Sequence, residues 1–277
     1  MLVFRRRAAF SMMRTHPATL VRMSPTITFI CIAVTALITS FISGILGMAG
    51  GMILMGVLLA LLSLPAAMML HGITQFASNG WRAWLWRRQV NWRIFRGYAA
   101  GAFLALLVFI VVQLVVSKPV AYILLGLTPF ASVVLPKRLA LNVDHRGHPT
   151  LCGAVCMAMQ LLAGVSGPLL DVFFVQSKMD RRGVIATKAL SQTLGHLLKI
   201  FYFGGISVLG SISSGAGIGL SLPLIVACVV LAFTGTTLSR FVIDKMSDAN
   251  FRLWTQWTVM TMGVIYLGTG LWMMMRA

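Results

Sequence analysis

The sequence has little negative charge and little charge of any kind. Only five of its 277 residues are acidic, all of them aspartates, and charged residues make up 10% of the chain, where a soluble domain has about 25%. Hydrophobic residues make up 58%, and the mean hydropathy is +0.91. A soluble chain of this composition could not cover its surface with polar groups, so most of it must face lipid. The apolar content also excludes a disordered chain.

Motifs that would indicate a metal site, a cofactor or a nucleotide are absent from the sequence. There is no P-loop, no zinc-ligand spacing and no GxGxxG followed by an acidic residue. The sequence therefore predicts no metal and no cofactor, and it does not predict an enzyme. Four cysteines lie in apolar segments without a C-x-x-C motif, which is typical of small buried hydrophobes: Cys31, Cys152, Cys156 and Cys228.

The positive charge is abundant, with 23 Lys and Arg residues and a formal net charge of +18. Such a balance often indicates nucleic acid as the partner. Here most of the basic residues fall in short clusters between apolar runs, which is the pattern of cytoplasmic loops in a multi-pass membrane protein. We therefore expect a lipid bilayer and no nucleic acid as partners. Residues 1–26 form a basic N-terminal extension that is too polar to span a bilayer.

Ten apolar segments predict an all-α polytopic integral membrane protein. Five lie in the first half of the chain, at 27–46, 52–64, 68–86, 97–116 and 119–135. Five lie in the second half, at 150–166, 168–177, 183–204, 216–238 and 252–275. We interpret 27–135 as a first membrane repeat, 136–149 as a cytoplasmic linker and 150–275 as a second membrane repeat.

The two halves match at a fixed offset of 117 residues. The matched pairs are Gly47 and Gly164, Gly50 and Gly167, Gln75 and Gln192, Ala49 and Ser166, Thr74 and Ser191, and Arg82 and Lys199. Glycines, an amide and a cation thus keep one register, which indicates an internal repeat. A chance match of glycines in a glycine-rich membrane chain is the alternative.

The charges of the links indicate that the two halves have opposite orientations. The link 87–96 contains four arginines and the link 63–67 has no charge; in the second half the link 177–182 is basic and the link 205–215 is uncharged. By the positive-inside rule the sequence predicts an inverted-topology repeat, a feature of many secondary transporters. The basic N-terminus does not fit, because a full hairpin of the first two segments would place it outside.

Residues 44–51 (GILGMAGG) lie between two apolar segments and resemble the first signature of the TauE/SafE sulfite-exporter family. Residues 163–169 (AGVSGPL) resemble the second, repeated signature, and residues 90–93 (VNWR) resemble the Trp-Arg step after the third helix. The similarity extends over roughly residues 27–275. The resemblance implies a multi-pass protein of the bacterial inner membrane that moves small sulfur-containing anions such as sulfite or organosulfonates.

Each glycine motif is expected to break one helix and start another. A helix start presents free N–H groups and the positive end of a dipole, which favours an anion. In lipid, such a break persists only where protein or a polar cavity surrounds it. We therefore predict substrate contacts at the two breaks, with close helix packing as the alternative: Gly47, Gly50, Gly51, Gly164, Ser166 and Gly167.

Four polar residues lie near the middle of their predicted helices, in two pairs spaced four residues apart. Gln75 and Asn79 form one pair, and Gln192 and His196 form the other. The spacing places each pair on one helical face, and polar side chains at mid-membrane face the protein interior. They could donate hydrogen bonds to an anion without a fixed charge. Hydrogen bonding between helices is the alternative.

Three further candidates carry charge. Asp171 is the one carboxylate placed within a predicted membrane segment, and we expect it to pair with Lys188 or His196 or to carry a coupling proton. Arg82 and Lys199 lie near the ends of their segments. The favoured interpretation is that they snorkel to the interface, and a position near the pathway is the alternative.

The sequence thus favours a secondary transporter, acting as an exporter of a small anionic substrate. A membrane redox relay through cysteines is an alternative, although none of the four cysteines has a cysteine at the offset position. A non-transporting assembly subunit is a second alternative, and a homo-oligomer is left open.

The topology prediction can be checked by labelling introduced cysteines in intact cells. Cysteines at positions 63 and 211 should label from outside, and cysteines at 93 and 247 should label only from inside. The expected result follows from the swapped loop charges. Labelling of the links 63–67 and 177–182 from the same side would contradict the inverted repeat.

Overall fold

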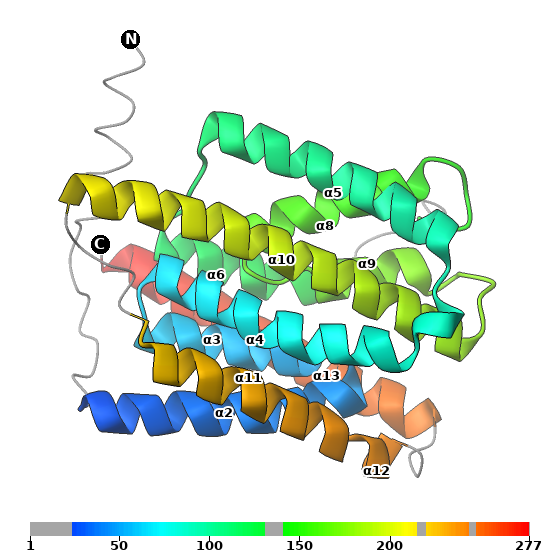
Figure 1. Ribbon diagram of the computed structural model, residues 1–277, viewed down its shortest axis with the longest axis horizontal. Coiled ribbons are helices and arrows are strands. Elements are labelled where there is room, and N and C mark those ends of the chain that lie inside the picture. Colours follow the sequence, from blue (N-terminus) through cyan, green and yellow to red (C-terminus); the bar gives the residue numbers. More distant parts are fainter. Residues whose placement is uncertain (1–23, 131–140, 215–219, 244–247, 277) are drawn as a thin grey trace.

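The computed structural model describes residues 24–130, 141–214, 220–243 and 248–276, and its regular elements there are helices (Figure 1). The prediction of an all-α chain is confirmed. In chain order the elements are α2 (Pro25–Leu46), α3 (Ala49–Leu61), α4 (Leu64–Leu85), η1 (Arg87–Gln89), α5 (Trp92–Val112), α6 (Lys118–Leu127), η2 (Thr128–Phe130), α8 (His148–Leu162), α9 (Gly167–Phe174), α10 (Arg181–Ser214), α11 (Leu222–Leu238), α12 (Arg240–Ile243) and α13 (Asp248–Met275).

Each of the ten predicted segments contains a helix, but the helices also extend into the predicted links. Within the link 63–67, α4 begins at Leu64, with Pro65 in its first turn, where a missing N–H costs nothing. Within the link 205–215, α10 continues to Ser214. Each helical glycine costs only about 1 kcal/mol, so Gly204 and Gly205 do not end a helix that is anchored in the bundle. The basic extension up to residue 23 and residues 131–140 lie outside the described residues.

Four helical stretches are long and apolar enough to cross a membrane in the described part of the chain: Pro25–Leu46, Trp92–Val112, Leu222–Val242 and Leu253–Met275. They carry large apolar side chains that are more than half exposed, among them Ile30, Leu104, Val111, Leu222 and Trp257. Exposed apolar surface on this scale is unfavourable in water. These helices therefore face lipid, and the chain is a multi-pass membrane protein.

The helices α4 and α10 pack against each other inside the bundle (Figure 1). Two further pairs pack around them, α2 against α11 and α5 against α8, and α6 packs against α13. Each of these four pairs joins one helix from each half of the sequence. Because lipid contacts the outer helices, α4 and α10 can carry polar residues that a lipid-facing helix would not tolerate.

The helices α3 and α9 are too short to cross a bilayer alone. They have 13 and 8 residues, or about 20 and 12 Å at a rise of 1.5 Å per residue, whereas the hydrocarbon core is about 30 Å thick. Both follow a glycine break, as the sequence predicts. Each break therefore lies within the bundle, where protein surrounds its free backbone groups.

Basic residues gather at one end of the bundle. Figure 1 shows η1, the start of α8, the α9–α10 connection and α12 at this end, and the α3–α4 turn, the α5–α6 connection and the end of α13 at the other. Those first elements carry Arg87, Arg88, Arg181, Arg182 and Arg240. The positive-inside rule predicts that this end faces the cytoplasm. The start of α2 lies at the opposite end, so the position of the basic residues that precede it still conflicts with the positive-inside rule.

Close packing between the two halves depends on glycine. At Gly101 in α5 a methyl group would overlap the backbone carbonyl oxygen of Thr150, and at Gly153 in α8 it would overlap that of Tyr98. Gly235 in α11 contacts the backbone of α2 in the same way, near Leu37. Small residues allow helix backbones to approach closely, and in a membrane this packing is a main source of helix association.

We expect Gly101→Ala to destabilise the protein by about 1–3 kcal/mol, because the added methyl group forces α5 and α8 apart. Gly268→Ala in α13 is the matched control, since that glycine is exposed and a methyl group there meets no atom within 4 Å. The control should be neutral or slightly stabilising. Thermal unfolding of both variants in detergent checks the expectation, and equal stability of the two would contradict it.

Candidate functional site

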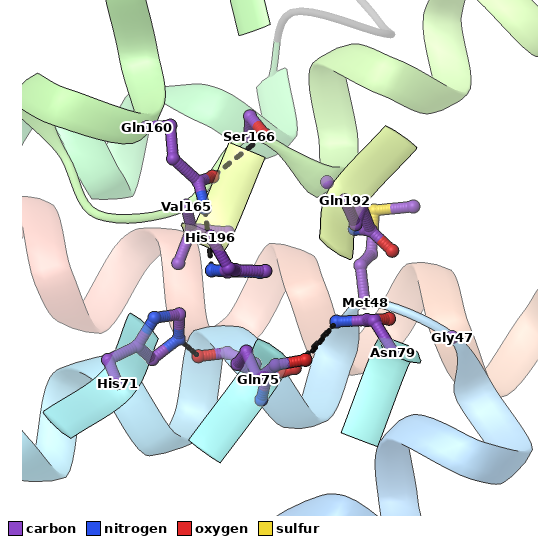
Figure 2. A pocket seen from close by; sticks show the side chains of 12 residues that line it. Gly47, Met48, His71, Gln75, Asn79, Gln160, Val165, Ser166, Gln192 and His196 are labelled. Carbon is purple, nitrogen blue, oxygen red and sulfur yellow. Dashed lines mark hydrogen bonds between the residues drawn. The ribbon is translucent and has the colours of Figure 1, made fainter. Parts of the chain in front are cut away.

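A small cavity lies where the two glycine breaks meet α4 and α10 (Figure 2). It has room for about one water molecule. Its lining combines backbone at both breaks with neutral polar side chains: Gly47, Met48, Gly51, His71, Gln75, Asn79, Gln160, Val165, Ser166, Gly167, Gln192 and His196.

Left-handed glycines build both breaks. Gly47 follows α2 with φ 66°, and Gly164 follows α8 with φ 81°, a region that residues with a Cβ seldom adopt. The chain then turns directly into α3 at Ala49 and into α9 at Gly167, and neither helix has a side chain that caps its first turn. The positive ends of two helices therefore meet at the cavity.

A chain of hydrogen bonds along α4 fixes the orientation of the Gln75 amide. Arg82 Nη1 donates to Asn79 Oδ1 at 3.5 Å, and Asn79 Nδ2 donates to Gln75 Oε1 at 3.2 Å. Gln75 Oε1 therefore already accepts a hydrogen bond. Gln75 Nε2 is buried and has no hydrogen-bond partner among the described residues, and the side chain borders the cavity (Figure 2). The chain thus ends in free N–H donors at the cavity.

A second chain runs on the opposite side of the cavity. Ser166 Oγ donates to Gln160 Oε1 at 2.9 Å, and the Gln160 amide nitrogen lies 2.7 Å from His196 Nδ1 (Figure 2). Because Gln160 Nε2 is a donor, Nδ1 of His196 accepts, which leaves the ring hydrogen on Nε2. His196 is therefore a neutral imidazole with a donor of its own.

Two basic side chains bind the carbonyl ends of the broken helices. Arg82 Nη2 donates to the backbone oxygen of Ser43 in the last turn of α2 at 2.8 Å, and Lys199 Nζ donates to that of Gly164 after α8 at 2.9 Å. The negative end of a helix dipole favours a cation there. The snorkelling interpretation is wrong for both residues, because Lys199 is completely buried and Arg82 points into the break.

His71 joins the two breaks. Its Nε2 lies 2.9 Å from the backbone oxygen of Gly51, and its Nδ1 lies 2.8 Å from Lys199 Nζ. A carbonyl oxygen can only accept, so Nε2 carries the hydrogen and Nδ1 accepts from the lysine. A continuous path of hydrogen bonds therefore runs from Gly51 through His71 and Lys199 to Gly164.

The structure brings together most of the residues that the sequence predicts for a site. Eight of them line the cavity: Gly47, Gly51, Ser166, Gly167, Gln75, Asn79, Gln192 and His196. Gly50 and Gly164 do not. Gly50 packs against the backbone of α2 at Thr39 and Ser43, and Gly164 supplies the carbonyl that Lys199 binds. The role of the eight residues remains a prediction.

Two polar residues of the lining, His71 and Gln160, are not among the residues predicted for the site. Gln160 was detectable, because it is a polar residue inside the apolar segment 150–166 and precedes Gly164 by one turn. His71 lies one turn before Gln75, on the face that Gln75 shares with Asn79, but the predicted segment begins at residue 68 and places His71 close to a helix end. The structure starts α4 at Leu64 instead.

Asp171 and Lys188 form an ion pair away from the cavity. Of the partners considered for Asp171, the structure selects Lys188, while His196 accepts from Gln160. The Asp171 side chain is 39% exposed and the Lys188 side chain 20%. Neither residue lines the cavity.

Short helices that start inside a membrane bundle and point their positive ends at a polar site are typical of secondary transporters. A comparison with known families agrees with this class. The family model "Sulfite exporter TauE/SafE" matches residues 32–266, and the chain belongs to this family of membrane transporters. The resemblance of the two glycine motifs is thereby confirmed. No curated protein and no solved structure matches the chain.

The two neighbouring glycines of the first break should respond differently to alanine. At Gly50 a methyl group would overlap the backbone oxygen of Thr39, so we expect Gly50→Ala to lose about 1–3 kcal/mol of stability. At Gly51 the nearest atom to a methyl group is Gln75 Nε2 at 3.4 Å, an ordinary contact, so Gly51→Ala should keep the stability of the parent. Thermal unfolding in detergent distinguishes them, and equal destabilisation would contradict the assignment.

Proposed function

We propose that the protein exports small sulfur-containing anions, such as sulfite or organosulfonates, across the bacterial inner membrane and binds them in the central cavity. The observation that carries the proposal is the Gln75 amide nitrogen, which is buried, borders the cavity and has no hydrogen-bond partner in the described part of the chain. A buried donor without an acceptor costs about 1–3 kcal/mol. An oxyanion, which offers only acceptors, would satisfy it.

The rest of the lining supports an anion over a cation. Both helix starts present their positive ends, Gln75 and His196 offer donors, and the cavity has no carboxylate in its lining. The two basic residues of the site, Arg82 and Lys199, lie behind this lining, where they contact the lining residues Asn79 and His71. Because the lining itself offers neutral donors, we expect binding that is specific for anions and weak enough for release.

Transport requires the cavity to open. Room for one water molecule is too little for a sulfonate, so the helices around the cavity must move apart before the anion enters. The inverted repeat that we propose supplies such a motion, since rocking of one half against the other exposes a central site to each side in turn. The pairing of helices across the halves, α2 with α11 and α5 with α8, supports this arrangement.

The cysteines give a redox relay little support. Cys152 and Cys156 are adjacent in α8, with their sulfur atoms 4.0 Å apart, and Cys31 and Cys228 lie on other helices. All four are free thiols, and none lines the cavity. If the proposal is correct, replacing all four by serine leaves transport intact. Transport by the purified protein alone in liposomes separates a transporter from an assembly subunit.

Gln75→Met tests the proposed site. Methionine keeps the volume and removes the donors, and a hydrogen bond to a charged group contributes about 1.5–3 kcal/mol, so anion affinity should fall by about tenfold or more. Gln256→Met, at an exposed position of α13, is the matched control and should bind as the parent does. Binding and efflux of sulfite and of methanesulfonate by proteoliposomes are the measurements. Unchanged affinity in Gln75→Met would place the anion elsewhere.

A further inference from the structure

We propose that Lys199 is a proton-binding site coupled to the anion: it is neutral when the cavity is empty and takes up one proton when an anion binds. The inference rests on the anion site proposed above. It assigns the coupling proton to the lysine behind the cavity, and not to Asp171, whose carboxylate is occupied by Lys188.

Among the described residues, no negative charge lies beside Lys199 to balance an ammonium group. The titratable groups that face it are His71 from α4 and His196, one turn earlier on its own helix. Gly72 lies against the end of the lysine side chain, and the sulfur atoms of Met55 and Met68 lie beside Gly164. Arg82, the other basic residue of the site, is bound at the opposite break.

Three aspartates whose side chains are described are engaged elsewhere. Asp144 binds Ser177 and the backbone of Lys178, Asp180 caps Gly183 at the start of α10, and Asp171 pairs with Lys188. An isolated ammonium buried without a partner is so unfavourable that such groups normally lose their proton. The empty site therefore favours the neutral amine, and an anion in the cavity supplies the missing charge.

The hydrogen bonds of Lys199 suit both protonation states. A neutral amine has two hydrogens, which is enough to donate to the Gly164 oxygen at 2.9 Å and to His71 Nδ1 at 2.8 Å. The added proton leaves both bonds in place and gives the nitrogen a third hydrogen. Protonation therefore changes the charge behind the cavity without rearranging its lining.

The position of Lys199 couples its charge to both helix starts. Through His71 it is linked to the Gly51 carbonyl in the first turn of α3, and directly to Gly164, three residues before α9. His71, which binds the lysine, itself lines the cavity. A charge at this distance, in surroundings of low dielectric constant, interacts strongly with a bound anion. By linkage, a ligand that favours the protonated form must draw in the proton.

The test is calorimetric titration of the purified protein with methanesulfonate, an anion that does not itself titrate near neutral pH. Repeating the titration in buffers of different ionisation enthalpy gives the number of protons taken up per anion. We expect about one proton at pH 8, with the apparent Kd rising up to tenfold per pH unit as pH rises. Binding with no proton uptake and no pH dependence would overturn the inference.

Variants assign the proton to a residue. Lys199→Arg carries its charge at every pH, so it should bind methanesulfonate with no proton uptake. His71→Gln and His196→Gln should retain the uptake, whatever their affinity, because the lysine remains. Loss of uptake in either histidine variant together with normal uptake in Lys199→Arg would overturn the assignment. If Lys199→Arg does not fold, the parent and the two histidine variants still test the assignment. Uptake of about one proton in all three supports Lys199, and loss of uptake in a histidine variant that still binds the anion contradicts it.

Failure of the inference and failure of the proposed function give different results. If the parent protein binds neither methanesulfonate nor sulfite, the proposed anion site is wrong, and the proposed proton site with it. If the parent binds these anions without taking up a proton, only the proposed role of Lys199 is wrong.

Discussion

A helix that ends inside a bilayer leaves carbonyl groups and N–H groups without partners, and this constraint organises the centre of the protein. At both breaks the carbonyl groups find partners in the same way. A basic side chain from the third helix of each half binds the carbonyl end, Arg82 at Ser43 and Lys199 at Gly164. The N–H ends of α3 and α9 are turned toward a shared cavity instead, where no side chain caps them.

The orientation of the polar side chains around the cavity depends on these contacts at the breaks. With Arg82 fixed at its break, the amide of Asn79 is oriented by Arg82 and orients Gln75 in turn. On the other side, Ser166 orients Gln160. Each chain directs donors inward, so the cavity is electropositive although its lining carries no fixed charge. Apolar outer helices, packed closely through glycines such as Gly101, keep this centre away from lipid.

The sequence predicts the helices and most of the site because both leave local signals. Long apolar runs indicate α2 and α5. The matches at an offset of 117 residues, Gly47 with Gly164 and Gln75 with Gln192, indicate the site. The burial of Lys199 leaves no such signal: its position in the segment 183–204 suggests a helix end, whereas α10 extends to Ser214 and places it mid-helix. Contacts between halves, such as Lys199 with His71, depend on packing that no local pattern encodes.

The central claim is that an anion binds between the starts of α3 and α9, and a structure with a heavy oxyanion tests it most directly. Selenate is a suitable probe, because its selenium scatters anomalously and its oxygens resemble those of a sulfur oxyanion. The account predicts one anomalous peak between Gly51 and Gly167, with an oxygen within hydrogen-bond distance of Gln75 Nε2. Selenate bound only at the basic end of the bundle, with the central cavity empty, would contradict it.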